Sequence, residues 1–149
     1  LAAYTGNRTR LTGWPRIHRS LSRKVPGLPD VKERAGEWEM TTFPMISYSQ
    51  FNEWMEQGKV AQLVDLREPW MFERDRIWGS VNIPYDELED LMGEIRKDGT
   101  IVFYCDRGAK SMVVCRDLWR MGYHAVDLAD GMLNYRGKYI DRRPLSALE

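Results

Sequence analysis

The sequence predicts an α/β fold in which a mainly parallel sheet is covered by helices on both faces. Short, continuously apolar runs at 63–66, 100–104 and 125–128 have the pattern of strands that are buried on both sides. Between them lie segments whose apolar residues recur at helical spacing. Strands that alternate with helices in this way favour parallel pairing. At 149 residues, the chain has room for one such domain with a substantial core.

The first predicted elements are a short strand and a helix. Ile46 ends the strand, and Ser47 with Gln50 has the S-x-x-Q spacing of a capping box, which starts a helix. Gly58 ends this helix. Its apolar face consists of Phe51, Trp54 and Met55.

The next segment is predicted to hold two strands and two helices. A strand at 63–66 leads into a short helix over 68–74, which has Pro69 in its first turn, where proline is well tolerated. A third strand covers 81–83 and is closed by a proline. A further helix, which ends near Gly99, is predicted from the spacing of Leu88, Leu91, Met92 and Ile95.

The last third of the chain contains the strongest patterns. The most apolar strand covers 100–104, and the clearest helix follows over 109–121, ended by Gly122. The last strand covers 125–128, and a short helix is predicted over 133–137. Ligands of such folds bind at the carboxyl ends of the parallel strands, so the loop after 100–104 is a candidate site.

The sequence divides into three parts: an extension at 1–39, a domain at 40–145 and a tail at 146–149. The extension is rich in Gly, Pro, Arg, Ser and Thr, has no sustained period, and holds 8 basic against 4 acidic residues. We interpret it as a poorly ordered basic leader, or as a misplaced start with Met40 as the native one. Its Arg-rich, acid-free beginning also fits a mitochondrial transit peptide.

The overall composition excludes several classes of partner and location. Basic and acidic residues balance at 22 each, so nothing global indicates a nucleic acid or an anionic membrane as partner. No apolar run approaches the roughly 20 residues that span a bilayer, and the N-terminus lacks the apolar segment of a secretory signal. Two cysteines do not make the framework of a secreted scaffold. We expect a cytoplasmic protein, or a mitochondrial matrix protein if the extension is a transit peptide.

Cys105, which directly follows the strand at 100–104, is the candidate functional residue. It could be a nucleophile, a metal ligand, half of a disulfide or a structural thiol. The cysteines and histidines of the chain, which include Cys115, His18 and His124, do not have the spacing of metal ligands. The two cysteines lie ten positions apart and do not form a C-x-x-C pair. The charged loop that follows Cys105 argues against a merely structural thiol.

The loop after Cys105 is predicted to form an anion-binding cradle. If its backbone curls around the sulfur, its N–H groups point inward, and the start of the next helix adds the positive end of a dipole. Arg107 and Lys110 add full charges, and Gly108 allows a positive φ. Each of these features favours thiolate over thiol. Asp106 opposes them, unless Arg107 neutralises its charge or its carboxylate points to solvent.

The spacing in this loop indicates a small anion as the substrate. Cysteine-dependent phosphatases use C-x5-R, a longer loop sized for a phosphate. Here the base is Lys110, five places after Cys105, and Ser111 occupies the sixth place. The shorter spacing suits one extra atom on the sulfur better than a phosphoryl group. The candidate substrate-binding residues are Asp106, Arg107, Gly108, Ala109, Lys110 and Ser111.

Four segments together resemble the rhodanese family of single-domain sulfurtransferases, over roughly residues 45–137. They are the cysteine loop at 105–111, LVDLREP at 63–69, IWGSVNIP at 77–84 and GYHAVDLADG at 122–131. The resemblance implies a rhodanese-like three-layer fold with a central, mainly parallel sheet. The chain departs from the family pattern where Asp75-Arg76 replaces Gly-His, Lys110 replaces arginine, and Asp130-Gly131 replaces Gly-Gly. We expect these departures to affect which sulfur donor the protein prefers, rather than its membership of the sulfurtransferase class.

The resemblance also implies a chemistry, which is ping-pong transfer of sulfur. The Cys105 thiolate would attack the outer sulfur of a small anionic donor such as thiosulfate and become a persulfide. A thiol, cyanide or a protein cysteine would then accept that sulfur. The family needs no metal or organic cofactor, and neither a nucleic acid nor a membrane is expected as a partner. Asp65 and Arg67 either orient the loop from the neighbouring strand or form a buried ion pair.

Two other functions remain open at this point. One is a sulfur-relay or regulatory binding module with little turnover of its own, and the other is an arsenate reductase or phosphatase on a related fold. Cys115 is expected to pack in the core beside Leu118. Arg74 and Arg76 are expected either to ring the mouth of the site or to be solvated.

Overall fold

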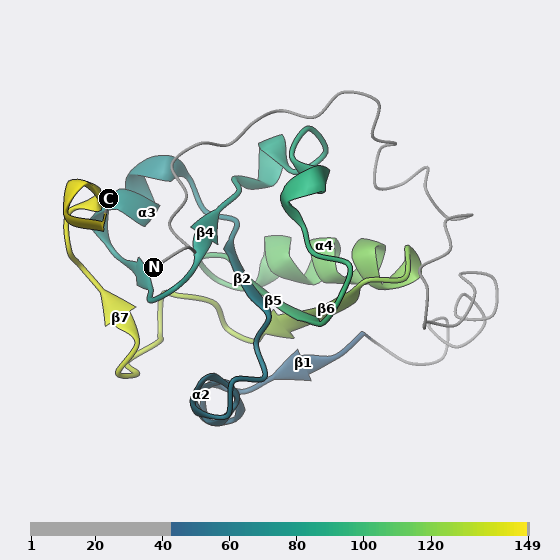
Figure 1. Ribbon diagram of the computed structural model, residues 1–149, viewed down its shortest axis with the longest axis horizontal. Helices are drawn as coiled ribbons and strands as arrows, with labels where there is room; N and C mark the ends of the chain where they lie inside the picture. Colours follow the sequence, from purple (N-terminus) through teal and green to yellow (C-terminus); the bar gives the residue numbers. More distant parts are fainter. Residues whose placement is uncertain (1–42, 149) are drawn as a thin grey trace.

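The computed structural model describes residues 43–148, and their central feature is a five-stranded sheet (Figure 1). The strand order is β1-β6-β5-β2-β4, and every pairing is parallel. The strands are β1 (Met45–Ile46), β2 (Gln62–Asp65), β4 (Val81–Asn82), β5 (Thr100–Tyr104) and β6 (His124–Leu128). The parallel sheet predicted from the sequence is confirmed, whereas the expectations for 1–39 lie outside the described residues.

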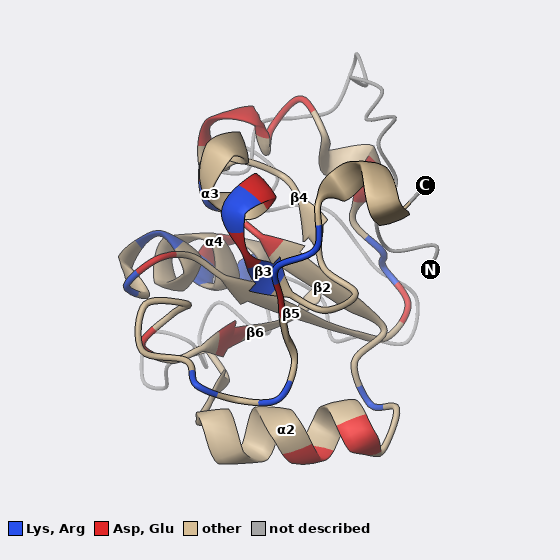
Figure 2. Cartoon of the chain, turned by 90° about the vertical axis from the view of Figure 1, so that its left-hand side faces the viewer, with Lys and Arg blue, Asp and Glu red and all other residues tan. Residues whose placement is uncertain are grey.

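Helices cover both faces of this sheet, as predicted. Helix α2 (Tyr48–Glu56) lies on one side, and α4 (Ala109–Arg120) lies on the other, with α3 (Pro69–Arg74) near the end of the sheet (Figure 2). Helix α2 begins with the predicted capping box, because the Gln50 N–H donates to the Ser47 hydroxyl and the Ser47 N–H donates back to Gln50. The result is three layers.

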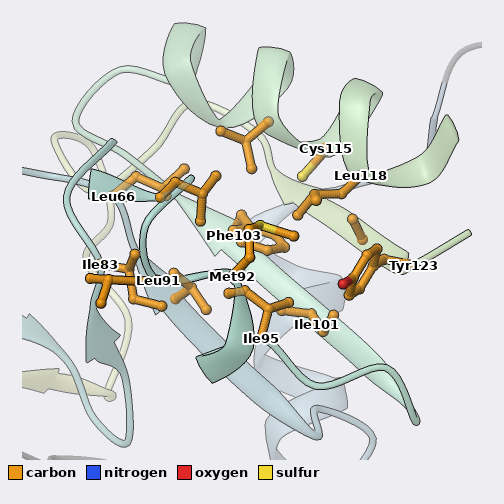
Figure 3. Packing of buried hydrophobic residues seen from close by; sticks show 14 of the residues in the cluster. Leu66, Ile83, Leu91, Met92, Ile95, Ile101, Phe103, Cys115, Leu118 and Tyr123 are labelled. Carbon is orange, nitrogen blue, oxygen red and sulfur yellow. The ribbon is translucent and has the colours of Figure 1, made fainter. Parts of the chain in front are cut away.

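The central strand β5 supplies side chains to two separate cores. Its residues alternate, so Phe103 and Cys105 face α4, whereas Val102 and Tyr104 face α2. The core under α4 packs Phe103 against apolar side chains of the helix, such as Leu118 (Figure 3). Because Cys105 continues the α4-facing row, its sulfur is directed under the start of that helix.

The helix predicted across 88–95 is absent, and this prediction was wrong. Two short 3-10 helices, η2 (Tyr85–Glu87) and η3 (Met92–Glu94), occupy the segment instead. The Gln62 side chain donates to the Glu94 carbonyl oxygen and accepts the N–H of Arg96, at 2.7 and 2.9 Å. In a continuous α-helix, the Glu94 carbonyl oxygen and the Arg96 N–H would instead form hydrogen bonds within the helix. The predicted apolar residues nevertheless all lie in the core, because 3-10 turns bring residues three apart to the same side.

The short helix predicted over 133–137 is also absent. This segment forms turns, because the N–H groups of Met132 and Leu133 donate to the carbonyl oxygens of Cys105 and Asp106, at 2.8 and 3.0 Å. The backbone after β6 is therefore bonded to the cysteine loop.

A second, two-stranded antiparallel sheet was not predicted. Strand β3 (Arg76–Ile77) pairs with β7 (Ile140–Asp141), and a 3-10 helix, η4 (Leu145–Leu148), follows. Both strands have only two residues, which is too short for a visible alternation pattern. No helix within residues 43–148 is long and apolar enough to cross a membrane.

Arg76, the first residue of β3, is fully buried, so the expectation that it rings the site or is solvated was wrong. Its guanidinium donates to the carbonyl oxygens of Phe72, Glu73 and Arg143 and pairs with Asp141. Sequence alone could not show this, because the partners come from α3 and from a segment more than sixty residues later.

Candidate active site

Cys105 lies at the carboxyl end of the central strand and borders a small cavity. The residue is only 4% exposed. The cavity has a volume of about 230 Å³, and its walls come from the segment after β2, from α3 and from the loop before α4. It is lined by Leu66, Arg67, Glu68, Met71, Cys105, Asp106, Arg107, Ala109 and Lys110. A thiol that lines a cavity of this size can meet a small molecule.

The loop after Cys105 wraps around its sulfur. The backbone N–H groups of Gly108 and Ser111 donate to Sγ at 3.1 and 3.5 Å. The Ser111 hydroxyl oxygen lies 3.5 Å from Sγ and donates to the Gly108 carbonyl oxygen at 3.1 Å. Gly108 has a φ of 99°, so the positive φ expected of it is confirmed. This arrangement places backbone donors where a negative charge on sulfur would form.

Helix α4 adds to this polarity, because it begins at Ala109, directly after the loop, with Gly108 as its N-cap residue. Its twelve residues form a helix long enough for its dipole to direct positive potential toward Cys105. The sulfur therefore faces a helix N-terminus as well as two N–H groups.

The charged residues of the loop lie at the surface. Arg107 and Asp106 form a long ion pair, with 4.0 Å between Nε and Oδ2, and their side chains are 79% and 37% exposed. The Asp106 carboxylate is thus partly solvated and lies close to a guanidinium, which weakens its opposition to a thiolate. The Lys110 ammonium lies 5.4 Å from the centre of the Tyr85 ring, at the wall of the cavity.

Asp65 and Arg67 form a buried ion pair at the end of β2. Two guanidinium nitrogens of Arg67 donate to the Asp65 carboxylate, and its Nη2 also donates to the Asp75 carbonyl oxygen. Burial raises the pKa of Asp65, and the hydrogen bonds from Arg67 oppose this rise. Because Arg67 also lines the cavity, the pair holds the wall opposite the cysteine loop.

Comparison with known proteins identifies the protein family to which this fold and site belong. The sequence profile of the family described as "Rhodanese-like domain" matches residues 47–138, which is more than half of the chain. The chain belongs to the rhodanese-like family. The matched range of this rhodanese-like domain includes the cysteine loop, the helices α2, α3 and α4, and every strand of the parallel sheet except β1.

Relatives of this rhodanese-like domain include named sulfurtransferases. It is 34% identical over 92 residues to the thiosulfate sulfurtransferase GlpE of Pseudomonas syringae, a match that covers 62% of this chain and 85% of that protein. It is 30% identical over 71 residues to the thiosulfate sulfurtransferase PspE of Escherichia coli, covering 46% of this chain and 68% of that protein. The chain spans only 54% and 63% of the length of two Bacillus subtilis relatives, YrkF and YqhL.

Solved structures show the same fold. A rhodanese-like domain protein from Staphylococcus aureus superposes with a TM-score of 0.62 at 22% identity, covering 68% of this chain and 99% of that one. The three-layer fold expected from the resemblance is therefore confirmed.

Several features of the site were not found from the sequence. Gly131 packs directly against the cysteine loop, where a Cβ atom would lie 2.5 Å from the Asp106 carbonyl oxygen. The Tyr48 hydroxyl donates to the Gly131 carbonyl oxygen at 2.6 Å, which ties α2 to the same point. The segment 122–131 resembles a family motif, but no local pattern in it predicts the contact with Tyr48.

Cys115 lies in the core, as predicted. It is fully buried, and its pKa is raised well above the usual value by burial and, to a smaller extent, by Asp127 and Cys105. A thiol in this environment stays protonated, so Cys115 is unsuited to resolve a disulfide with Cys105. Within residues 43–148, no group of three or more His, Cys, Asp and Glu side chains could hold a metal ion.

Proposed function

We propose that this chain transfers sulfane sulfur from a small anionic donor such as thiosulfate to a thiophilic acceptor, through a persulfide on Cys105. The observation that carries the proposal is the position of Sγ, which receives the N–H groups of Gly108 and Ser111 at the base of a 230 Å³ cavity. Three relatives carry the name thiosulfate sulfurtransferase, which agrees with this chemistry.

The reaction would proceed by two displacements at sulfur. The Cys105 thiolate attacks the outer sulfur of thiosulfate, the S–S bond of the donor breaks, and sulfite leaves with the electron pair. The acceptor then attacks the outer sulfur of the persulfide, and the Cys105 thiolate is regenerated as the leaving group. The N–H groups of Gly108 and Ser111 stabilise the Cys105 thiolate, whose charge is on Sγ, before the first step and again when the second step releases it. In the persulfide, the charge lies on the outer sulfur, one bond farther from these donors.

The first step can be tested by the intact mass of the protein. Incubation with thiosulfate, followed by removal of the donor, is expected to add one sulfur atom, about 32 Da. Cys105→Ser should abolish this gain, and Cys115→Ala should retain it, because Cys115 lies in the core. Unchanged mass of the wild-type protein with thiosulfate and with other sulfane donors would contradict the proposal.

Lys110 is expected to attract the anionic end of the donor. Lys110→Ala should slow persulfide formation from thiosulfate about 5- to 10-fold, since one charge at the mouth of a partly solvated site contributes on the order of 1 kcal/mol. The measurement is the rate of mass gain at low and high salt, because screening should shrink the difference between variant and wild type.

Two further variants test this interpretation of Lys110. Lys110→Arg keeps the charge and should keep most of the rate, whereas Arg116→Ala removes an exposed cation farther along α4, where it pairs with Asp117. Equal losses in Lys110→Ala and Arg116→Ala would show that the loop cation has no special role. Arg76 is not a suitable control, because it is buried.

A sulfur-relay module is the second candidate. It is favoured by two exposed apolar residues near the cavity: Trp70, 59% exposed on α3, and Leu133, 47% exposed, whose N–H binds the loop at Asp106. Such residues suit a protein that presents its own cysteine as the acceptor. The two functions differ in the second step, since a relay module would form the persulfide but transfer its sulfur to cyanide only slowly.

A further inference from the structure

Tyr48, the first residue of α2, lies beside the turn that follows β6. Strand β1 ends at Ile46, in register with Leu128, the last residue of β6, and the Ala129 N–H donates to the Ile46 carbonyl oxygen at 3.0 Å. The two segments therefore leave the sheet side by side, one into α2 and the other into the turn. The capping box fixes where α2 begins, and with it the position of Tyr48.

The turn after β6 has a conformation that needs support from its surroundings. Asp130 and Gly131 both have a φ of 66°, in the left-handed region that is less favourable for a residue with a side chain. The Tyr48 hydroxyl donates to the Gly131 carbonyl oxygen at 2.6 Å. The Tyr48 ring also meets the Tyr135 ring edge-on, with 5.4 Å between the ring centres. Helix α2 therefore holds the turn through a polar and an aromatic contact.

The peptide group between Gly131 and Met132 connects Tyr48 with the cysteine loop. Its carbonyl oxygen accepts the Tyr48 hydroxyl, and its N–H, which belongs to Met132, donates to the Cys105 carbonyl oxygen at 2.8 Å. A trans peptide group is planar, with its C=O and N–H pointing in opposite directions, so one of these bonds orients the other. Hydrogen bonds in such a chain also polarise and strengthen one another. Loss of the Tyr48 bond would therefore loosen the group that holds the Cys105 backbone.

The same turn contacts the cysteine loop at two more places. The Leu133 N–H donates to the Asp106 carbonyl oxygen at 3.0 Å, and a Cβ atom added to Gly108 would lie 3.5 Å from the Asp130 nitrogen. Gly108 is the residue whose N–H donates to Sγ of Cys105 at 3.1 Å. The position of the turn therefore affects where a backbone donor points relative to the sulfur.

We propose that Tyr48 is a positioning residue for Cys105. Its hydroxyl, acting through the peptide group between Gly131 and Met132, holds the cysteine loop in the conformation in which the Gly108 N–H points at Sγ. The cavity is lined by the segment after β2, by α3 and by the loop before α4, so Tyr48, on α2, acts through the backbone rather than on the substrate. This inference deepens the proposed function and rests on it, because the thiolate held by the loop is the species that attacks the donor.

The inference can be tested without a sulfur donor. The test is the rate at which iodoacetamide alkylates Cys105 in the folded, full-length chain between pH 5 and pH 10, followed by intact mass, because alkylation reports the thiolate population. Cys105→Ser should remove the signal, which assigns it to Cys105 rather than to the buried Cys115. Normal alkylation without persulfide formation would contradict the proposed function alone. An unchanged alkylation profile in a variant that still forms the persulfide would contradict this inference alone.

Tyr48→Phe removes only the hydroxyl, at a position that is partly exposed. The midpoint of its alkylation profile is expected about half a pH unit above that of the wild type, equivalent to alkylation about threefold slower at pH values below both midpoints. The reason is that a looser loop weakens the backbone hydrogen bonds to the thiolate. The charges of Asp106, Arg107 and Lys110 are the same in both proteins. A role of Tyr48 in stability alone would lower the temperature of unfolding and leave the profile in place.

Tyr135→Phe is the matched control. The Tyr135 hydroxyl donates to the Asn52 side chain of α2 at 2.7 Å, so this variant also loses a tyrosine hydrogen bond between α2 and the segment after β6. The lost bond does not involve the peptide group that binds Cys105. The midpoint of the alkylation profile should therefore stay within about 0.2 pH unit of that of the wild type.

Hydrogen exchange gives a second reading at the peptide group itself. The Met132 N–H should be protected in the wild type, and it should exchange about tenfold faster in Tyr48→Phe but not in Tyr135→Phe. An unprotected Met132 N–H in the wild type would overturn the proposal without the use of any variant. It is also overturned by an alkylation midpoint that stays within about 0.2 pH unit in folded Tyr48→Phe, or by an equal shift in Tyr135→Phe.

Discussion

Gly131→Ala is expected to slow persulfide formation on Cys105 by about 100-fold, because a methyl group at this position would push the cysteine loop out of place. The added Cβ atom would lie 2.6 Å from the Cys105 carbonyl oxygen and 2.5 Å from that of Asp106. Both contacts are with backbone, which cannot rotate away as a side chain can. A displaced Asp106 carries Gly108 with it, so the N–H group that lies 3.1 Å from Sγ would no longer point at the sulfur.

A matched control separates this displacement from backbone strain. Gly131 and Gly58 have nearly equal φ angles, 66° and 68°, so alanine meets the same backbone strain at both positions. At Gly58, however, no atom lies within 4 Å of the place that the added methyl group would occupy. That strain costs about 1–2 kcal/mol of the free energy of unfolding. Gly58→Ala should show this loss with a normal rate of persulfide formation. If both variants kept the wild-type rate while folded, the close approach of Gly131 would have no role in holding the loop.

Arg76→Met is expected to lower the free energy of unfolding by about 3–5 kcal/mol, because it leaves buried polar groups without their partner. Three carbonyl oxygens, from Phe72, Glu73 and Arg143, would each lose a hydrogen bond. Asp141 would lose one of two arginines, since Arg143 pairs with it at 2.8 Å. The measurement is urea denaturation, in which the midpoint should fall without a large change in slope.

Arg74→Met serves as the control for this substitution. Arg74 lies two residues earlier, its side chain is 57% exposed, and its ion pair with Asp75 is long, at 3.6 Å. An exposed pair of this kind contributes at most about 1 kcal/mol. Losses of similar size in Arg74→Met and Arg76→Met would contradict the structural role assigned to Arg76.

The parts of the fold that could be predicted from sequence are those determined by neighbouring residues. The capping box of Ser47 and Gln50 and the continuously apolar strands β2, β5 and β6 follow from patterns within a few positions. The cysteine loop is also determined by neighbouring residues, because Gly108 and the start of α4 lie within four residues of Cys105. Local chemistry was therefore enough to place a thiol at a helix N-terminus.

The failures occurred where distant groups compete for the backbone. The helix expected across 88–95 is replaced by 3-10 turns, and Gln62, some thirty residues earlier, binds their backbone. The helix expected over 133–137 is replaced by turns whose N–H groups bind Cys105 and Asp106. The apolar spacing at 88–95 correctly marked core residues. In both segments, however, the hydrogen-bond partners of the backbone lie elsewhere in the chain.

By itself, the sequence determined the α/β class, the order along the chain of the five strands of the parallel sheet, and the identity of Cys105 as the candidate nucleophile, because each depends on short-range periodicity or on one loop. Only the tertiary structure placed Gly131 against that loop and buried Arg76. Each of these depends on which strands are neighbours in the sheet. Strand order in space is set by the packing of the whole core, and no local pattern encodes it.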